Sequence, residues 1–295
     1  MNKICILLAA YNGSSYIKDQ ITSIQSQEYS NWDLYVNIDL SEDSTKEIVA
    51  EMANLDSRIS ILKNERFGSA GKNFYDLIKN APIEKYEFVA FADQDDIWNS
   101  KKLSKAISIL NDKNYKGYSS SMTALYPSGK KIYIDKSKNQ KLIDYKFESA
   151  GPGCTYVFNR EIAMLTRNCL LKHPLIEEQF HYHDWLVYYV ARNNSHNWYI
   201  DKYSSMYYRQ HEKNDTGANI GIRSALKRLK VFMSGWYFDQ VYLLESTISK
   251  KISLDEFLGK RNGFRIYWLF RFFHTRRSPL HAIILGFCSF LRLIR

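Results

Sequence analysis

Apolar residues in the first half of the chain alternate between two spacings. Residues 3–10, KICILLAA, form an almost continuous apolar run, which is typical of a strand buried on both faces. The next apolar residues, Ile17, Ile21 and Ile24, recur at the spacing of one helical face. This pattern predicts a buried strand, rather than a secretion signal, followed by a helix that packs on it.

The same alternation continues to about residue 112. Further strands are expected over residues 32–39, 58–63 and 86–93. Ser100 is the expected N-cap of the last helix. One further helix is expected over residues 43–55. Two others are expected from apolar residues that share one face: Phe74, Leu77, Ile78 and Ala81 on the first, and Leu103, Ile107 and Leu110 on the second. Strands separated by such helices imply right-handed crossovers, so the sequence predicts an α/β unit of the nucleotide-binding type with a parallel sheet.

Candidate site residues follow these strands, at the edge where parallel sheets bind their ligands. An aromatic ring and an acid suit a nucleotide base, and a lysine beside glycines suits a phosphate. Asp93 and Asp95 are hard oxygen ligands that suit a divalent cation bridging a diphosphate. The residues after the four strands are, in order, Ala9, Tyr11 and Asn12, then Asp39, then the glycine-rich residues 64–73 with Lys72, then Asp93, Asp95 and Asp96.

Several function classes are disfavoured by what the sequence lacks. It has neither a GxGxxG fingerprint after the first strand nor a GxxxxGK[ST] loop, which argues against NAD enzymes and P-loop kinases. No apolar run reaches the roughly 18 residues of a membrane span. Its four cysteines are far apart in sequence, so we expect reduced thiols in a cytosolic protein rather than disulfides or a zinc site: Cys5, Cys154, Cys169 and Cys288.

Four successive segments resemble the signatures of family 2 glycosyltransferases: ILLAAYNGSSYI, QSQEYSNWDLYVNIDLSEDST, NERFGSAGKNF and FADQDDIW. The similarity covers about residues 3–215 and implies an α/β domain of the GT-A fold over residues 1–215. It departs from the family where the usual DDG is Ile38, Asp39 and Leu40. The resemblance implies donor-nucleotide contacts from Ala9, Tyr11, Asn12, Asp39, Lys72 and Asp93, and a Mn²⁺ or Mg²⁺ cofactor on Asp93, Asp95 and His211.

Three motifs in the second half extend this resemblance. The segment GCTYVFNRE matches the sugar-binding wall of the family, and YRQH, residues 208–211, contributes Arg209 and His211. In the segment HDW, Asp184 matches the acid that acts as general base of an inverting transfer. An aspartate there also suits the start of a helix. The residues that the resemblance assigns to acceptor or sugar binding are Gly153, Cys154, Thr155, His183, Trp185 and Arg209.

The resemblance therefore implies an inverting, metal-dependent glycosyltransferase. Its motifs look most like the rhamnosyltransferase branch, with dTDP-rhamnose as donor and a polyprenyl-diphosphate-linked glycan of O-antigen or capsule synthesis as acceptor. A UDP-hexose donor in the same kind of pathway is an alternative. A nucleotidylyltransferase and a nucleic-acid-binding protein are rivals of other classes. The nucleotidylyltransferase should carry a basic glycine loop after the first strand, where this chain has AAYNGSS.

Charge is concentrated at the C-terminus. The net charge is +10, and no acid follows Glu256, whereas eight Lys and Arg residues do. No nucleic-acid-binding module is found, so we expect no nucleic acid partner. Residues 216–295 mix these cations with aromatic residues, and Pro279 divides the last part of the extension into two expected helices. The extension is expected to associate with the anionic inner face of a bacterial cell membrane, which makes the protein cytoplasmic and peripheral. Packing of these helices on the catalytic domain or on a partner subunit is the alternative.

Overall fold

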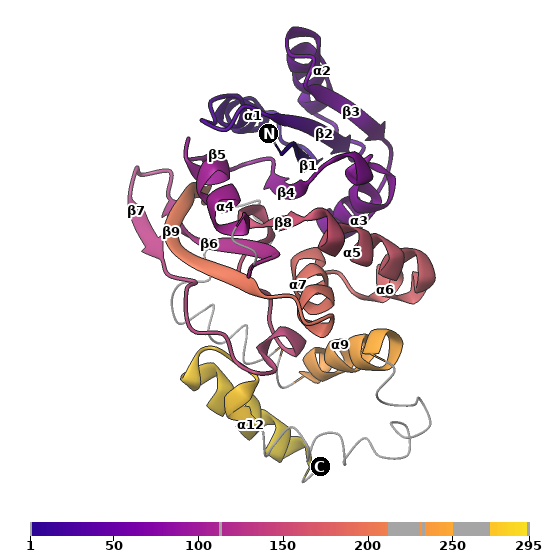
Figure 1. The fold of residues 1–295 in the computed structure, drawn as a ribbon, viewed down its shortest axis with the longest axis vertical. Coiled ribbons are helices and arrows are strands. Elements are labelled where there is room, and N and C mark those ends of the chain that lie inside the picture. The colour runs from indigo at the N-terminus through magenta and orange to yellow at the C-terminus, as the bar shows by residue number, and fades with distance from the viewer. Residues whose placement is uncertain (1, 112–113, 212–230, 232–233, 250–271, 294–295) are drawn as a thin grey trace.

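The computed structural model describes residues 2–111, 114–211, 231, 234–249 and 272–293. Four parallel strands form its first half: β1 (Ile4–Ala10), β2 (Trp32–Ile38), β3 (Ile59–Asn64) and β4 (Phe88–Asp93), in the order β3-β2-β1-β4 (Figure 1). This confirms the parallel sheet predicted from the apolar runs. The pairing places Ala9 beside Asp93 and Ala10 beside Ile38, so the candidate loops leave one edge of the sheet.

Helices cover both faces of these strands. They are α1 (Ile17–Gln25), α2 (Thr45–Leu55), α3 (Ala70–Asn80) and α4 (Lys102–Leu110), with a 3-10 turn, η1 (Ile83–Lys85), before β4. The side chain of Ser69 accepts a hydrogen bond from the Lys72 N–H and caps α3. Ser100 is not the cap of α4, because the helix begins later and the Ser100 hydroxyl donates to Glu28 Oε1 instead, at 3.3 Å.

The second half continues the sheet as a mixed structure. Its strands are β5 (Ile97–Trp98), β6 (Gly117–Leu125), β7 (Lys131–Ile134), β8 (Val157–Asn159) and β9 (Trp198–Arg209). β8 pairs antiparallel with β4 and β6, and β9 runs parallel to β6 and returns the chain to the edge where β4 ends. The remaining elements here are the 3-10 turns η2 (Asp144–Lys146) and η3 (Gly153–Thr155) and the helices α5 (Arg160–Lys172), α6 (Pro174–Gln179) and α7 (His183–Asn193).

Two hydrophobic cores lie on opposite faces of the sheet. Successive residues of β1 divide between them, because side chains alternate along a strand. Cys5 and Leu7 join the core with α3, α5 and α7, whereas Ile4, Ile6 and Leu8 join the core with α1, α2 and α4. Burial of both faces explains why the run in residues 3–10 is apolar at nearly every position.

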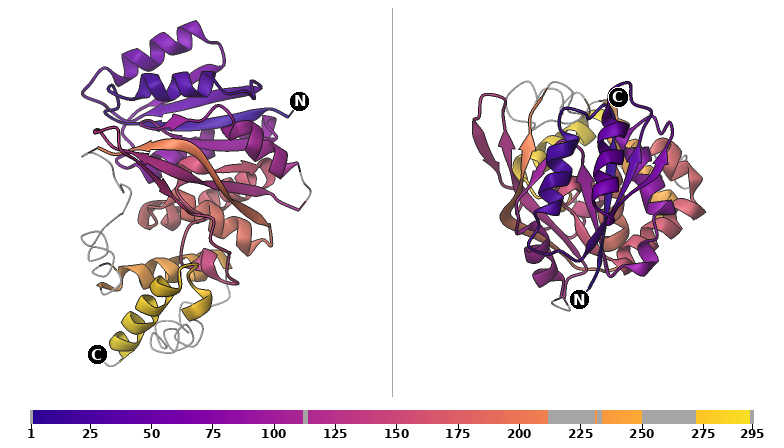
Figure 2. Two further views of the ribbon diagram at one scale, coloured as in Figure 1. Left: turned by 90° about the vertical axis from the view of Figure 1, so that its left-hand side faces the viewer. Right: turned by 90° about the horizontal axis from the view of Figure 1, so that it is seen from above.

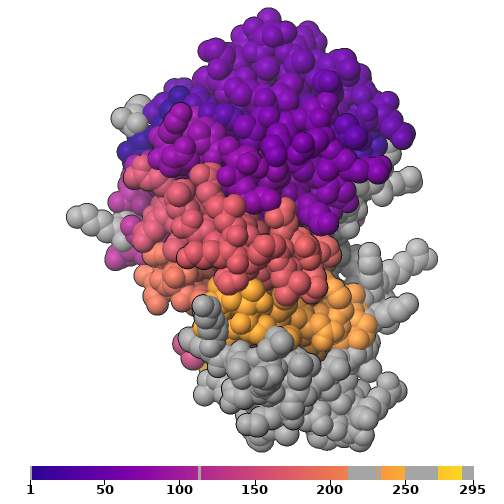
Figure 3. Space-filling view, turned by 90° about the vertical axis from the view of Figure 1, so that its right-hand side faces the viewer, coloured from indigo at the N-terminus to yellow at the C-terminus, as the bar shows by residue number. Residues whose placement is uncertain are grey.

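The described part of the C-terminal extension packs beneath the sheet domain. It comprises α9 (Trp236–Leu244), a π-helical turn η4 (Glu245–Ser249), a 3-10 turn η5 (Phe272–His274) and α12 (Pro279–Leu293). Figures 2 and 3 show α9 against the helices of the second half. The Lys146 ammonium and the Glu245 carboxylate form a buried ion pair across this boundary. Removing one partner of such a pair typically costs about 3–5 kcal/mol of stability. None of the described helices has the length and hydropathy of a membrane span.

Candidate active site

Tyr11 and Asn12 follow β1 and adopt different roles in the structure. The Tyr11 side chain is 55% exposed at the rim of the sheet, which leaves its ring open for stacking. Asn12 has a positive φ of 46° and is used within the turn. Its backbone N–H donates to Ser41 Oγ at 3.0 Å, and its side-chain oxygen accepts from the Glu42 N–H at 2.8 Å. These bonds join the loop after β1 to the loop after β2.

Asp39, directly after β2, ties two loops together. One carboxylate oxygen accepts from the Leu40 N–H and the other from the Gly68 N–H, each at 2.8 Å. Gly68 belongs to the glycine-rich loop and has a positive φ of 81°. Lys72 follows in the first turn of α3. Asp39 therefore holds the glycine-rich loop beside the turn that carries Tyr11.

Three carboxylates crowd at the end of β4. Burial, and then the charge of Asp95, raises the pKa of Asp93 to about 7. Asp96 is fully buried, and burial with the charges of Asp95 and Asp93 raises the pKa of its carboxyl well above the usual range. Apart from the Cys154 thiol, the Asp96 carboxylate has no hydrogen-bond partner among the described residues. Acids held this close favour the binding of a cation.

His211 approaches these acids from the end of β9. Its Nε2 atom lies 2.8 Å from Oδ2 of Asp95, and its ring stacks on Tyr16 with 4.6 Å between centroids. The Arg209 guanidinium lies 5.4 Å from the centroid of the same Tyr16 ring and 2.7 Å from Asp19 Oδ2. The structure thus brings His211 to the predicted metal site, while α1 holds Arg209.

The donor atoms at the end of β4 suit Mn²⁺ or Mg²⁺. The possible ligand atoms of Asp93, Asp96 and Cys154 lie within 4.8 Å of one another. Burial raises the pKa of the Cys154 thiol well above its usual range, so the thiol stays protonated, and it hydrogen-bonds with the carboxylates of Asp93 and Asp96. The atoms left for a metal are carboxylate oxygens and the nearby imidazole of His211. A hard divalent cation prefers such oxygen ligands.

Asp184 lies in the first turn of α7. It is not the N-cap, which is Tyr182; its Oδ1 atom accepts from the Trp185 N–H at 2.7 Å. Burial raises the pKa of Asp184 to about 6, against the opposing hydrogen bonds from the Trp185 N–H and the Ser149 side chain. The Asp184 charge in turn helps to raise the pKa of Asp93. A carboxylate with such a pKa is a stronger base than an exposed one.

The two neighbours of Asp184 face the protein interior. The His183 ring stacks on Phe74 with 4.0 Å between centroids, and burial lowers its pKa to about 3, so His183 is neutral. The Trp185 ring is buried, and its Nε1–H donates to the Tyr145 carbonyl at 2.9 Å. Both rings pack against protein, and the sugar contacts expected from His183 and Trp185 stay predictions.

Gly153, Cys154 and Thr155 are also buried, and their expected place on a sugar-binding wall stays a prediction. The Thr155 hydroxyl donates to the Pro152 carbonyl at 2.8 Å and so serves the turn η3. A Cβ atom on Gly153 would lie only 2.5 Å from His183 Nε2. The turn needs glycine here because the HDW segment packs directly on its backbone.

Residues 5–163, more than half of the chain, match the family model described as glycosyl transferase family 2. The chain belongs to this family. It is an inverting glycosyltransferase, and the nucleotidylyltransferase alternative is thereby set aside.

Among relatives, this glycosyltransferase is 37% identical to the dTDP-rhamnosyl transferase RfbG of Shigella flexneri over 278 residues, 94% of this chain and 96% of RfbG. It is 38% identical over 115 residues to the Escherichia coli UDP-Glc:alpha-D-GlcNAc-diphosphoundecaprenol beta-1,3-glucosyltransferase WfgD, covering 38% of this chain and 42% of WfgD. S. aureus TarS 1-349 in complex with UDP-GlcNAc superposes with a TM-score of 0.56 at 16% identity, covering 98% and 91% of the two chains. The fold is GT-A with a helical C-terminal region.

Three side chains of the glycosyltransferase's site went unrecognised in the sequence. The Gln94 amide exchanges two hydrogen bonds with the Tyr11 backbone, at 2.8 and 2.7 Å. Lys102 is fully buried; its ammonium donates to the Cys154 carbonyl, and burial lowers its pKa to about 7. The charge of Lys136 lowers the pKa of Asp184. Lys102 precedes Leu103 of an apolar stripe, and Gln94 stands among the residues that follow the fourth predicted strand. Nothing in the sequence marks Lys136.

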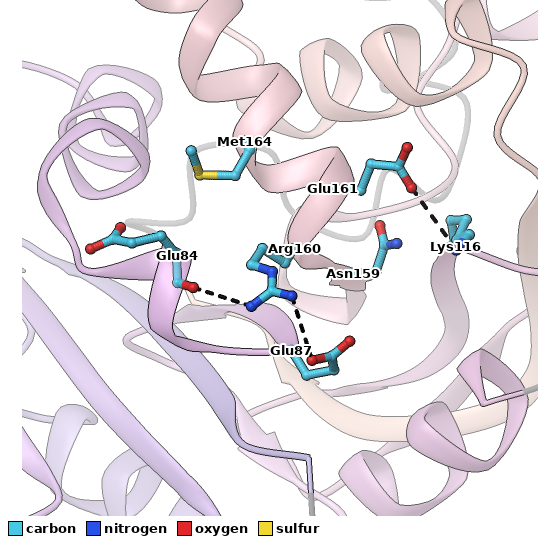
Figure 4. Close-up of a pocket in the computed structure, with 7 residues that line it drawn as sticks. All are labelled: Glu84, Glu87, Lys116, Asn159, Arg160, Glu161 and Met164. Carbon is cyan, nitrogen blue, oxygen red and sulfur yellow. Dashed lines mark hydrogen bonds and ion pairs between the residues drawn. The ribbon is translucent and has the colours of Figure 1, made fainter.

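A separate cavity of about 500 Å³ lies away from this site (Figure 4). It borders the start of β4 and the end of β8, where Phe88 pairs with Asn159, and so lies at the opposite edge of the sheet from Asp93. The cations that line it lie near acids: Arg160 is 3.9 Å from Glu87, and Lys116 is 3.9 Å from Glu161. The cavity therefore takes no part in the chemistry of the candidate active site.

Proposed function

We propose that this glycosyltransferase transfers rhamnose from dTDP-rhamnose to a polyprenyl-diphosphate-linked glycan in the synthesis of O-antigen or capsule. The identity to a dTDP-rhamnosyl transferase over nearly the whole of both chains supports this donor. The name of WfgD, a relative over part of its length, supports a lipid-linked acceptor. A UDP-hexose donor is the alternative. It has less support, because the relatives whose names give that donor match over less than half of the chain.

The observation that carries the proposal is that the acids after β4 and Asp184 on α7 lie near one another. Strand β4 ends at Asp93, and Asp95 follows it with His211 beside it. Asp184 on α7 is close enough for its charge to raise the pKa of Asp93. Mn²⁺ or Mg²⁺ on the acids after β4 would neutralise the diphosphate as it leaves. A neighbouring solved structure, a mannosyltransferase of Pyrobaculum calidifontis, is described as a complex with GDP-Man and Mn²⁺.

The chain's own residues divide the remaining work. Tyr11 offers an exposed ring to the base, and Asp39 fixes the loops on either side. Lys72, in the first turn of α3, supplies a cation near the phosphates. Asp184 takes the proton of the acceptor hydroxyl as the new bond forms, and its raised pKa suits this role. General base catalysis of this kind contributes roughly 10²- to 10⁴-fold in rate.

A panel of donors tests the proposal. The protein is incubated with a lipid-linked glycan and dTDP-rhamnose, UDP-glucose, UDP-galactose or UDP-N-acetylglucosamine, with Mn²⁺, with Mg²⁺ or with EDTA. We expect transfer from dTDP-rhamnose alone, lost in EDTA and restored by either metal. Turnover of a UDP-hexose without turnover of dTDP-rhamnose would reject the donor, and full activity in EDTA would reject the metal.

The C-terminal helix supports the further proposal that the enzyme works at a membrane surface. Leu280, Ile283 and Phe287 lie on one face of α12, and each is more than half exposed. Ala282 and Leu285 on the opposite side are buried against the protein. An exposed apolar face of this kind can enter the interfacial layer of a bilayer, where a lipid-linked acceptor is held.

Two of the eight cations after Glu256 are paired within the protein. Arg276 and Arg277 lie near Glu148, at 3.4 and 3.3 Å, and their side chains are mostly buried. The other six cations after Glu256 lie outside the described residues, or their side chains do: Lys260, Arg261, Arg265, Arg271, Arg292 and Arg295.

Point variants test the membrane proposal better than truncation, which would also remove Arg276 and Arg277. We expect Ile283→Asp and Phe287→Asp to reduce sedimentation with vesicles that contain anionic lipid. Leu55→Asp, at an exposed position of α2, is the matched control and should sediment like the native protein. Equal sedimentation of all four proteins would reject α12 as the contact.

A further inference from the structure

Arg277 is the centre of a buried network that joins the C-terminal segment to the loop after η2. Its backbone N–H donates to Glu148 Oε1 at 2.6 Å, and its guanidinium donates to the Ser149 carbonyl. The guanidinium Nε also lies 3.3 Å from Glu148 Oε1 and 3.9 Å from Asp144 Oδ2. Burial alone would raise the pKa of the Glu148 carboxyl, but Arg277 and Arg276 hold it below its usual value.

Arg276 joins the same segment to the other side of the site. Its guanidinium lies 4.7 Å from the centroid of the Tyr237 ring on α9. Tyr237 stacks on Trp185, with 5.4 Å between centroids and 21° between planes. Trp185 directly follows Asp184 and donates its backbone N–H to the Asp184 carboxylate.

The loop held by Arg277 also borders Asp184. The Ser149 hydroxyl donates to the Gly151 carbonyl at 2.9 Å, and the same side chain is close enough to Asp184 to lower the pKa of its carboxyl. A Cβ atom on Gly153, at the end of this loop, would lie 3.2 Å from Asp184 Cβ. The C-terminal segment therefore supports Asp184 along two routes: Arg277 through Ser149, and Arg276 through Tyr237 and Trp185.

We propose that Arg276 and Arg277 are positioning residues for Asp184, so that the C-terminal extension is part of the catalytic apparatus and not only an attachment to it. This inference rests on the proposed role of Asp184 as the base. A guanidinium is needed because Glu148 and Asp144 are buried acids, and an unpaired buried charge is costly. Helix α12 begins at Pro279, two residues after Arg277, so the helix with the exposed apolar face is joined directly to the support of the base.

The test compares Arg277→Met, Arg277→Lys and Ser149→Ala with the native enzyme. Misplacement of a catalytic group by about 1 Å can cost on the order of 100-fold in rate. We expect kcat of Arg277→Met to fall about 10- to 100-fold, with the KM for donor within about twofold, and Arg277→Lys to recover part of the loss. In Arg277→Met and Ser149→Ala the acidic limb of the kcat profile should move to higher pH, because the Ser149 side chain, which lowers the pKa of Asp184, is displaced or removed.

Arg160→Met is the matched control, since Arg160 is a half-exposed arginine whose own partner is Glu87 at the far edge of the sheet. It should leave kcat and its pH profile unchanged. A native kcat and pH profile in both Arg277→Met and Ser149→Ala would overturn the inference. It would also be overturned if Ser149→Ala behaved as the native enzyme and the loss of kcat in Arg277→Met equalled the fraction of unfolded protein. Full activity of Asp184→Asn would instead reject the base, and with it the proposed mechanism.

Discussion

The Nε2 atom of His211 lies 2.8 Å from Oδ2 of Asp95, although 116 positions separate the two residues in the chain. Strand β9 makes this possible, because it runs parallel to β6 and ends at the same edge of the sheet as β4. The Asp95 carboxylate and the His211 imidazole are therefore neighbours in the candidate metal site.

Replacing His211 by alanine should therefore weaken the binding of Mn²⁺. We expect the Mn²⁺ concentration for half-maximal activity to rise about 10- to 100-fold, in the range found when partners of metal sites are removed. Titrating activity with Mn²⁺ measures this. Tyr16→Phe keeps the ring that stacks on His211 and should behave as the native enzyme; a native Mn²⁺ requirement in His211→Ala would remove His211 from the metal site.

Asp184→Asn should abolish most of the transfer while keeping the fold. The amide has nearly the shape of the carboxylate but cannot take a proton, so kcat should fall about 10²- to 10⁴-fold. Transfer rates and thermal unfolding are measured together, with dTDP binding as a check on the donor site. Glu161→Gln, which removes a half-exposed carboxylate at the far cavity, is the control and should stay active.

The pH dependence follows from the raised pKa of Asp184, about 6 against an ordinary 3.8. The ionised form is the base, so kcat should rise with pH through about 6 and then level. The folded chain binds this proton more tightly than the unfolded chain does. Its contribution to stability is therefore lost as the pH rises from about 4 to about 6. Asp184→Asn should show neither change, and an acidic limb retained in its residual activity would assign the limb to another group.

Gly153→Ala should lower both stability and activity. Its new Cβ would lie 2.5 Å from His183 Nε2, closer than any ordinary contact, so the HDW segment must shift. We expect a lowered melting temperature and a reduced kcat. His183→Ala in the same chain removes the collision, so the double variant should be more stable than additivity of the two single changes allows. Strict additivity would show that the turn adjusts without strain.

The first half of the fold could be predicted from the sequence because β1 and β4 are buried on both faces, which leaves apolar runs such as residues 3–10. The candidate residues after these strands were predictable for the same reason. The meeting of Asp95 and His211 was expected only through a family motif, since no local pattern specifies a contact over such a separation.

Other positions depend on contacts that the sequence does not display. Cys154 and Thr155 looked suited to a sugar, but the turn η3 buries them. Trp185 is covered by Tyr237 of the C-terminal extension, whose packing no periodicity in the HDW segment reveals. The same holds for Arg276 and Arg277, which were read as surface cations because their acidic partners lie more than a hundred residues away.

The packing of Gln94 restricts which residues can occur at position 13 in related sequences. Its side-chain amide occupies the space above Gly13, where a Cβ atom would lie 2.1 Å from Gln94 Oε1. Positions 13 and 94 should therefore covary. Relatives that keep a long side chain between the two aspartates should keep glycine at the turn after β1, and relatives that lose this glycine should carry a small residue between the aspartates. Changes in the loop after β4 and changes in the turn after β1 are therefore coupled in evolution, because residues 13 and 94 compete for the same volume.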